Sequence, residues 1–125
     1  MERVLGIGGF FFRAKDPHAL ARWYEMNLGI CVYPATDDWW IQQGGPTVLA
    51  PFEADTGYFG RPEQQAMVNF RVRDLDAMLA QLRGGGATVS DEIHEITYGR
   101  FGWATDPEGN RFELWQPSPD LQVAH

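Results

Sequence analysis

Cysteine is almost missing from this chain: Cys31 is the one thiol among 125 residues. A single thiol forms no intramolecular disulfide and supplies no cysteine-based metal site. Cys31 follows a predicted helix in an apolar setting, so we interpret it as a buried structural thiol rather than a reactive one. Disulfide-stapled scaffolds and zinc fingers are therefore excluded, and the chain has to rely on a hydrophobic core.

Positive charge is also scarce. The sequence has 10 Lys and Arg against 17 Asp and Glu, which gives a formal net charge of −7. A protein with this balance is repelled by nucleic-acid backbones and by anionic membrane surfaces. We therefore expect neither as a partner, and a neutral or cationic small molecule is the easier ligand to accommodate.

Long hydrophobic runs are absent as well. The strongest candidate, residues 4–12, is followed at once by Arg13, Lys15 and Asp16. It is too short to span a membrane and lacks the small-residue cleavage pattern of a signal peptide. Phosphate-loop and Ser-His-Asp signatures are missing too. We expect a cytoplasmic protein.

Aromatic residues are abundant, at 14% of the chain, and two of the five tryptophans lie in a predicted hairpin over residues 99–117. Its strands flank the turn-forming cluster 106–110. Pairing about this turn places Trp103 opposite Glu113 on one face. The other face takes Ala104, Phe112 and Leu114.

The first half of the chain begins with an alternating strand over residues 4–14. Asp16 is the predicted N-cap of a helix, with Pro17 at the first helical position and Gly29 at the end. Three short strands separated by turn formers are predicted next, at 30–33, 39–43 and 47–50.

The second half repeats this order. Residues 68–72 alternate as a strand, and Asp74 stands 58 positions after Asp16 as the cap of a second helix, which closes at the glycine run 84–86. Three more strands are predicted, at 87–89, 100–105 and 111–116. Each half is therefore a βαβββ unit, and the chain is an internal duplication.

The elements predict one α+β domain over residues 1–125. Module 1 covers about residues 4–52 and module 2 about residues 66–117. A connecting loop at 53–65 separates the two pseudo-symmetric modules, and residues 118–125 form a tail.

Two βαβββ units closed by DPEGNRFEL resemble the vicinal oxygen chelate superfamily, which includes glyoxalase I, bleomycin-resistance proteins, extradiol dioxygenases and fosfomycin-resistance enzymes. The openings FFRAKDPHALARWYEMNLG and VNFRVRDLDAMLAQL carry the same resemblance. It covers residues 4–117. The resemblance implies an incompletely closed, eight-stranded, barrel-like sheet and a homodimer.

Metal-dependent members of this superfamily hold their ion with four side chains, usually His and Glu. The matching positions of this sequence are Gly9, Leu49, Met67 and Glu113. Only Glu113 can ligate a metal, and one carboxylate is too few for an ion that prefers oxygen and nitrogen ligands. The histidines, at His18, His94 and His125, do not complete the set. We therefore expect no metal and no other cofactor.

Strand alternation gives the sheet face away from the helices a mixed aromatic and polar character. Such a face fits a ligand cleft better than core or plain solvent-facing surface. Its predicted members are Phe11, Arg13, Met67, Asn69, Arg71, Trp103, Arg111, Glu113 and Trp115.

Glu113 has two interpretations. It is either a cleft acid, acting as a general base or as the partner of a cationic ligand, or it forms a structural ion pair with Arg71, Arg111 or Arg100. Asn69 either binds a ligand or satisfies a strand neighbour.

Other candidates lie at the margins of the predicted cleft. Trp39 and Trp40 point to opposite faces of one strand, so one is expected in the core and the other is free to stack on a ligand. Tyr98 and Arg100 form either a lid edge or ordinary loop packing. His94 is expected to be a surface loop residue.

Two functions remain open. The first is a metal-independent binding protein of the bleomycin-resistance type, which takes up an aromatic or cationic small molecule. The second is a glyoxalase-like enzyme that transfers a proton through Glu113, which requires a further acid or base; Tyr98, His94 and Asp106 are the candidates.

Overall fold

The computed structural model describes residues 1–32 and 39–122, which form a small α+β fold. Its elements in chain order are α1 (Pro17–Leu28), β1 (Asn69–Arg71), α2 (Leu75–Gly84), β2 (Thr88–Val89), β3 (His94–Ile96), β4 (Gly99–Thr105), β5 (Arg111–Pro117) and the short 3₁₀ helix η1 (Pro119–Gln122). The predicted α+β class is confirmed.

The strands form one mixed, open sheet in the order β1-β5-β4-β2, with β3 paired to β4. β1 runs parallel to β5, and the other pairs are antiparallel. In the long β4–β5 hairpin Trp103 lies opposite Glu113 and Thr105 opposite Arg111, as the sequence predicts. The hairpin is therefore the centre of the sheet.

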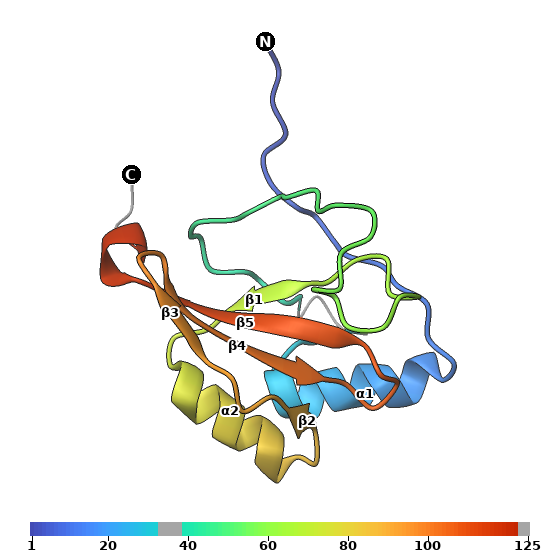
Figure 1. Ribbon diagram of the computed structural model, residues 1–125. Helices are drawn as coiled ribbons and strands as arrows, with labels where there is room; N and C mark the ends of the chain where they lie inside the picture. Colours follow the sequence, from blue (N-terminus) through green and yellow to red (C-terminus); the bar gives the residue numbers. More distant parts are fainter. Residues whose placement is uncertain (33–38, 123–125) are drawn as a thin grey trace.

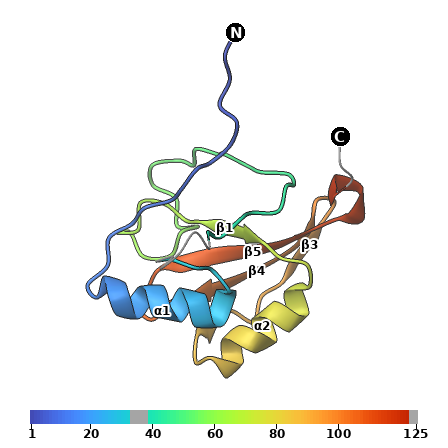
Figure 2. The ribbon, with the colours of Figure 1, turned by 180° about the vertical axis from the view of Figure 1, so that it is seen from behind.

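Both helices cover one face of this sheet, and the chain of the first half crosses the other (Figures 1 and 2). The core lies between the helices and the sheet, because apolar residues at helical spacing on α2 pack against the alternating apolar residues of β4 and β5. Its buried members are Leu75, Leu79, Leu82, Ala104, Phe112 and Leu114.

The predicted helix caps are confirmed. The Asp16 carboxylate accepts a hydrogen bond from the Ala19 amide at 3.1 Å, and Asp74 accepts one from the Ala77 amide at 3.0 Å. Gly29 ends α1 with φ at 70°, a conformation that favours glycine.

The predicted strands of the first half are not formed. None of the described residues before Asn69 lies in a strand, although 4–14, 39–43 and 47–50 were expected to. Their apolar side chains are exposed, with Phe11 at 93% and Leu49 at 91%. A strand needs a ladder partner and a buried face to fix its register, and these segments have neither. The prediction for residues 30–33 falls partly outside the described residues.

Two further local predictions need correction. Cys31 is half-buried rather than fully buried. β3 lies in a stretch that was expected to be a loop, because His94 and the two residues after it pair with the start of β4.

The turn of the hairpin ties the first half of the chain to the second. The buried Asp106 carboxylate accepts the Tyr24 hydroxyl at 2.7 Å, and it also accepts the amides of Glu108 and Asn110. The Glu108 carboxylate in turn accepts the Lys15 amide at 2.6 Å and the Asp16 amide at 3.0 Å. The start of α1 is thereby docked on the turn.

This docking makes stability depend on the charge of Glu108. The amides of Asp16 and Lys15 hold the pKa of Glu108 below its ordinary value. A group with a lowered folded-state pKa stabilises the fold above its unfolded-state pKa, and this contribution is lost as the pH falls through the folded-state pKa. We expect Glu108→Gln to lower the Tm at neutral pH and to match the wild type in acid.

Thermal unfolding followed by circular dichroism from neutral to acidic pH measures this difference. The matched control is Glu63→Gln, which removes the charge of an exposed acid on the connecting loop. A Tm difference for Glu108→Gln that is the same at every pH would contradict the assignment.

Candidate functional site

Glu113 is a buried carboxylate on the sheet face opposite the helices, 8% exposed. One oxygen accepts the Asn69 side-chain amide at 2.6 Å, and the other accepts the Trp103 indole N–H at 3.0 Å and the Tyr58 hydroxyl. These four residues are called the Glu113 cluster. Each oxygen of the carboxylate therefore accepts at least one hydrogen bond, and all three donors are neutral.

The strands place two of these donors by register alone. Asn69 of β1 and Trp103 of β4 are the direct neighbours of Glu113 on either side. Directly opposed residues point to the same face of a sheet, so both side chains meet the carboxylate. The predicted pairing of Trp103 with Glu113 is confirmed, and Asn69, predicted on the same face, lies next to Glu113 on the other side.

Tyr58 was missed by the sequence analysis. It lies in the non-periodic segment between the two halves, where strand alternation gives no information about direction. The available signal was compositional, because Phe52, Tyr58 and Phe59 give this loop unusual aromatic content. In the structure the Phe52 ring stacks on Tyr58 at 5.4 Å and contacts Phe59 at 5.1 Å.

The environment of Tyr58 keeps its hydroxyl protonated. Burial and the hydrogen bond to the Glu113 carboxylate raise the pKa of Tyr58 to about 12. The phenol is therefore a hydrogen-bond donor to Glu113 throughout the neutral range.

Among the described residues, no arginine forms an ion pair with Glu113. The Arg111 guanidinium lies over the Trp103 ring, 5.4 Å from its centroid, and its Nε donates to the Tyr58 carbonyl at 3.2 Å. Arg100 pairs with Asp76 and Glu95 on the helix side of the sheet. The structural ion-pair interpretation of Glu113 is therefore wrong.

An aromatic floor surrounds the cluster. Phe101 and Trp115 stack at 5.7 Å with their planes 7° apart, and the His94 ring meets Trp103 edge-on at 4.8 Å. The Trp115 indole N–H donates to the Tyr98 carbonyl at 3.0 Å. A flat ring is well matched to such a surface.

The same face is covered by residues 43–64, here called the cover segment, which crosses above the sheet in Figures 1 and 2. Arg71 donates to the Gln43 and Pro46 carbonyls at 2.7 and 2.8 Å. Gln64 exchanges two hydrogen bonds with the Arg111 backbone, at 2.7 and 2.9 Å. Trp103 is consequently only 1% exposed, and the face is closed rather than an open cleft.

The remaining predicted site residues lie outside the cluster. Phe11, Trp39, Trp40 and Tyr98 are exposed, and no described contact joins their side chains to Glu113. Met67 is half-buried just before β1. Asn69 is itself largely exposed on the edge strand, so the cluster is closest to solvent on that side.

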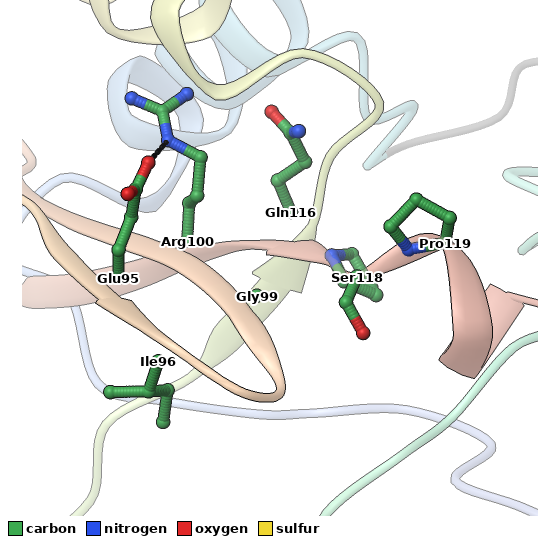
Figure 3. Close-up of a pocket in the computed structure, with 8 residues that line it drawn as sticks. Glu95, Ile96, Gly99, Arg100, Gln116, Ser118 and Pro119 are labelled. Carbon is green, nitrogen blue, oxygen red and sulfur yellow. Dashed lines mark hydrogen bonds and ion pairs between the residues drawn. The ribbon is translucent and has the colours of Figure 1, made fainter.

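Two hollows lie elsewhere. One, of about 240 Å³, is found where β3, β4 and β5 meet η1; Figure 3 shows Glu95 and Arg100 paired beside it. The other, of about 280 Å³, lies beside the hairpin turn and Arg61. Neither includes Glu113.

The residues present do not fit the metal site of the superfamily. Gly9, Leu49 and Met67 carry no hard donor, so Glu113 stands alone at the matching positions. Across residues 1–32 and 39–122, no three His, Cys, Asp or Glu side chains gather to hold an ion.

The model of the glyoxalase-like domain matches residues 9–115. The chain belongs to the glyoxalase-like domain family. The superfamily resemblance noted in the sequence is thereby confirmed. No curated protein matches the chain. Within the described residues, no helix of this glyoxalase-like domain has the length and apolar character of a membrane span.

Two solved structures share the fold of this glyoxalase-like domain. TnmS3, an antibiotic binding protein from Streptomyces sp. CB03234, is 21% identical with a TM-score of 0.60, and the match covers 94% of this chain and 100% of that one. A member of the glyoxalase/bleomycin resistance protein/dioxygenase superfamily from Sphaerobacter thermophilus DSM 20745 is 21% identical with a TM-score of 0.50, over 82% and 90% of the two chains.

The cluster predicts a large cost for removing its acceptor. Glu113→Ala leaves the buried Trp103 N–H without a partner and removes the acceptor of Tyr58 and Asn69. An unsatisfied buried donor costs about 1–3 kcal/mol, so we expect the free energy of unfolding to fall by about 2 kcal/mol or more. Urea denaturation measures this loss in the free energy of unfolding.

Glu95→Ala is the matched control, because it removes an exposed acid that pairs with Arg100. Exposed pairs contribute about 1 kcal/mol or less. Equal losses for the two variants would show that the Glu113 cluster does not stabilise the sheet.

Proposed function

We propose that this protein is a metal-independent small-molecule binding protein that takes an aromatic or cationic ligand on the Glu113 face. The observation that carries the proposal is a buried carboxylate with neutral donors as its only described partners, set in an aromatic floor. A carboxylate of this kind offers a strong acceptor to a cation or a polarised N–H or O–H group.

The net charge of the protein and its family relationship support the same function. The net charge of −7 attracts cations to the protein. Within the fold family, TnmS3 is described as an antibiotic binding protein, so a relative of this shape binds a small molecule. Family membership is consistent with a binding role as well as an enzymatic one.

The alternative, proton transfer by Glu113, has less support. Asp106 is used to dock α1 through Tyr24, and the nearest titratable neighbour of Glu113 is Tyr58, whose raised pKa of about 12 makes it a poor acid at neutral pH. His94 meets the ring of Trp103 rather than the carboxylate.

The proposal includes the quaternary and modular organisation expected from the sequence. A homodimer is supported by the exposed apolar side chains of the first half, which a second copy would bury. They include Val4, Leu5, Phe11, Trp39, Ile41 and Leu49. In such an assembly residues 4–52 would gain ladder partners and complete the eight-stranded, two-module sheet.

The remaining boundaries and the location belong to the same proposal. The connecting loop at 53–65, the second module at 66–117 and the tail at 118–125 divide a single domain. A cytoplasmic location is supported by the single cysteine, because proteins of the reducing cytoplasm rarely contain disulfides.

Binding is tested with proflavine, a planar aromatic cation whose fluorescence reports the complex. We expect saturable binding that Glu113→Gln weakens about tenfold, because the neutral amide loses the charge-assisted hydrogen bond. Glu95→Gln, which removes the same charge from the helix side of the sheet, should leave the affinity unchanged.

Equal weakening by the two substitutions would mean that proflavine binds the acidic surface at large. Catalysis makes a different prediction: a ligand that Glu113→Gln still binds but no longer turns over would identify an enzyme and overturn the pure binding function.

Metal independence is tested by elemental analysis of the purified protein. With one carboxylate at the four matching positions, we expect no stoichiometric nickel, zinc, manganese or iron. A content of about one ion per chain would contradict the proposal, because it would require a ligand set of another kind.

A further inference from the structure

Tyr58 occupies the Glu113 cluster in the way that a ligand would. Its phenol ring belongs to the cover segment, and its hydroxyl donates a hydrogen bond to Glu113. Its ring meets Trp103 edge-on, with centroids 6.1 Å apart and planes at 87°. The Phe52 ring stacks on the Tyr58 ring, with centroids 5.4 Å apart. An acceptor at one end and aromatic walls around the ring are together a recognition site for a phenol.

Tyr58 differs from the other two donors in how it is held. Asn69 and Trp103 belong to strands and are fixed by the register of the sheet. Tyr58 lies in a turn between Gly57 and Gly60, the latter at a φ of 92°. The donor on the irregular segment is therefore the one that can leave the carboxylate without breaking a ladder.

We propose that Tyr58 is an internal stand-in for the ligand, and that the ligand is an aromatic molecule carrying a hydroxyl or N–H donor that replaces the Tyr58 phenol on Glu113. This inference rests on the proposed binding function and names its ligand class. When the ligand enters, the Tyr58 hydroxyl goes to solvent and the ligand's donor takes its hydrogen bond.

The carboxylate explains why the ligand has to bring a donor. An ionised carboxylate only accepts hydrogen bonds, so an aromatic ether of the same shape cannot replace Tyr58 on Glu113. The oxygen that Tyr58 occupies also accepts the Trp103 indole, which stays in place and gives the incoming ring its wall.

Tyr58 also lowers the affinity of the site. A tethered competitor acts at a high effective concentration, and the apparent affinity of a ligand falls with the fraction of open protein. Removing the Tyr58 hydroxyl, while keeping its ring, therefore strengthens the binding of phenols specifically.

The test compares 2-naphthol with 2-methoxynaphthalene, which lacks the donor, by isothermal titration calorimetry. We expect Tyr58→Phe to bind 2-naphthol about five- to tenfold more tightly than the wild type, because the competing hydrogen bond is gone. Its affinity for 2-methoxynaphthalene should not change. Tyr98→Phe, which removes a hydroxyl from an exposed ring, is the matched control and should leave both affinities unchanged.

A second measurement uses the wild type and does not depend on the variant folding. The nuclear Overhauser contact between the Tyr58 ring and the Trp103 indole should disappear when 2-naphthol saturates the protein. Its persistence in the complex would overturn the displacement of Tyr58.

The outcomes separate this inference from the proposed function. Weaker or unchanged 2-naphthol binding by a folded Tyr58→Phe variant would overturn the stand-in role, and so would the absence of 2-naphthol binding in that variant. Proflavine binding that depends on Glu113 would survive either result. Loss of Glu113-dependent proflavine binding would instead remove the proposed function itself.

Discussion

The structure depends on two buried carboxylates that the β4–β5 hairpin carries on opposite sides of the sheet. A carboxylate removed from water has to be given donors, because its desolvation is otherwise too costly. Asp106, 4% exposed, takes the Tyr24 hydroxyl of α1, and Glu113, 8% exposed, takes the Tyr58 hydroxyl of the cover segment. The same requirement thus attaches α1 to one side of the second half and the cover segment to the other.

The two attachments differ in permanence. Asp106 also binds the amides of its own turn, and Tyr24 packs edge-on against Trp23 and Phe70 within the aromatic layer under the sheet. Burial raises the pKa of Tyr24 strongly, which reflects how completely this contact is enclosed. Tyr58, in contrast, lies in an irregular turn and not on a helix. The attachment of α1 through Asp106 is therefore the more enclosed of the two.

Sequence reasoning succeeded where a period or a cap determined the structure. The hairpin register, which sets Trp103 opposite Glu113, and the Asp16 and Asp74 caps follow from local rules. The position of Asn69 beside Glu113 depends on the long-range pairing of β1 with β5, which local rules do not give. Alternation also places Arg100 with Ala104 on the helix face, where it pairs with Asp76 instead of forming a lid edge. The contact of Tyr58 with Glu113 was not predictable, because an irregular loop has no period that sets the direction of a side chain.

The strands expected in the first half show why pattern alone is not enough. Alternation predicts that a segment can be a strand, but a strand forms only against a partner that buries one of its faces. In the described chain this half meets the sheet through side-chain hydrogen bonds, such as those of Arg71 and Gln64, rather than through a ladder. Each such bond has a net value of about 1 kcal/mol, so the cover segment can open locally at a cost far below that of global unfolding. Access to Glu113, on which the proposed binding function depends, is then governed by how firmly the cover segment is ordered.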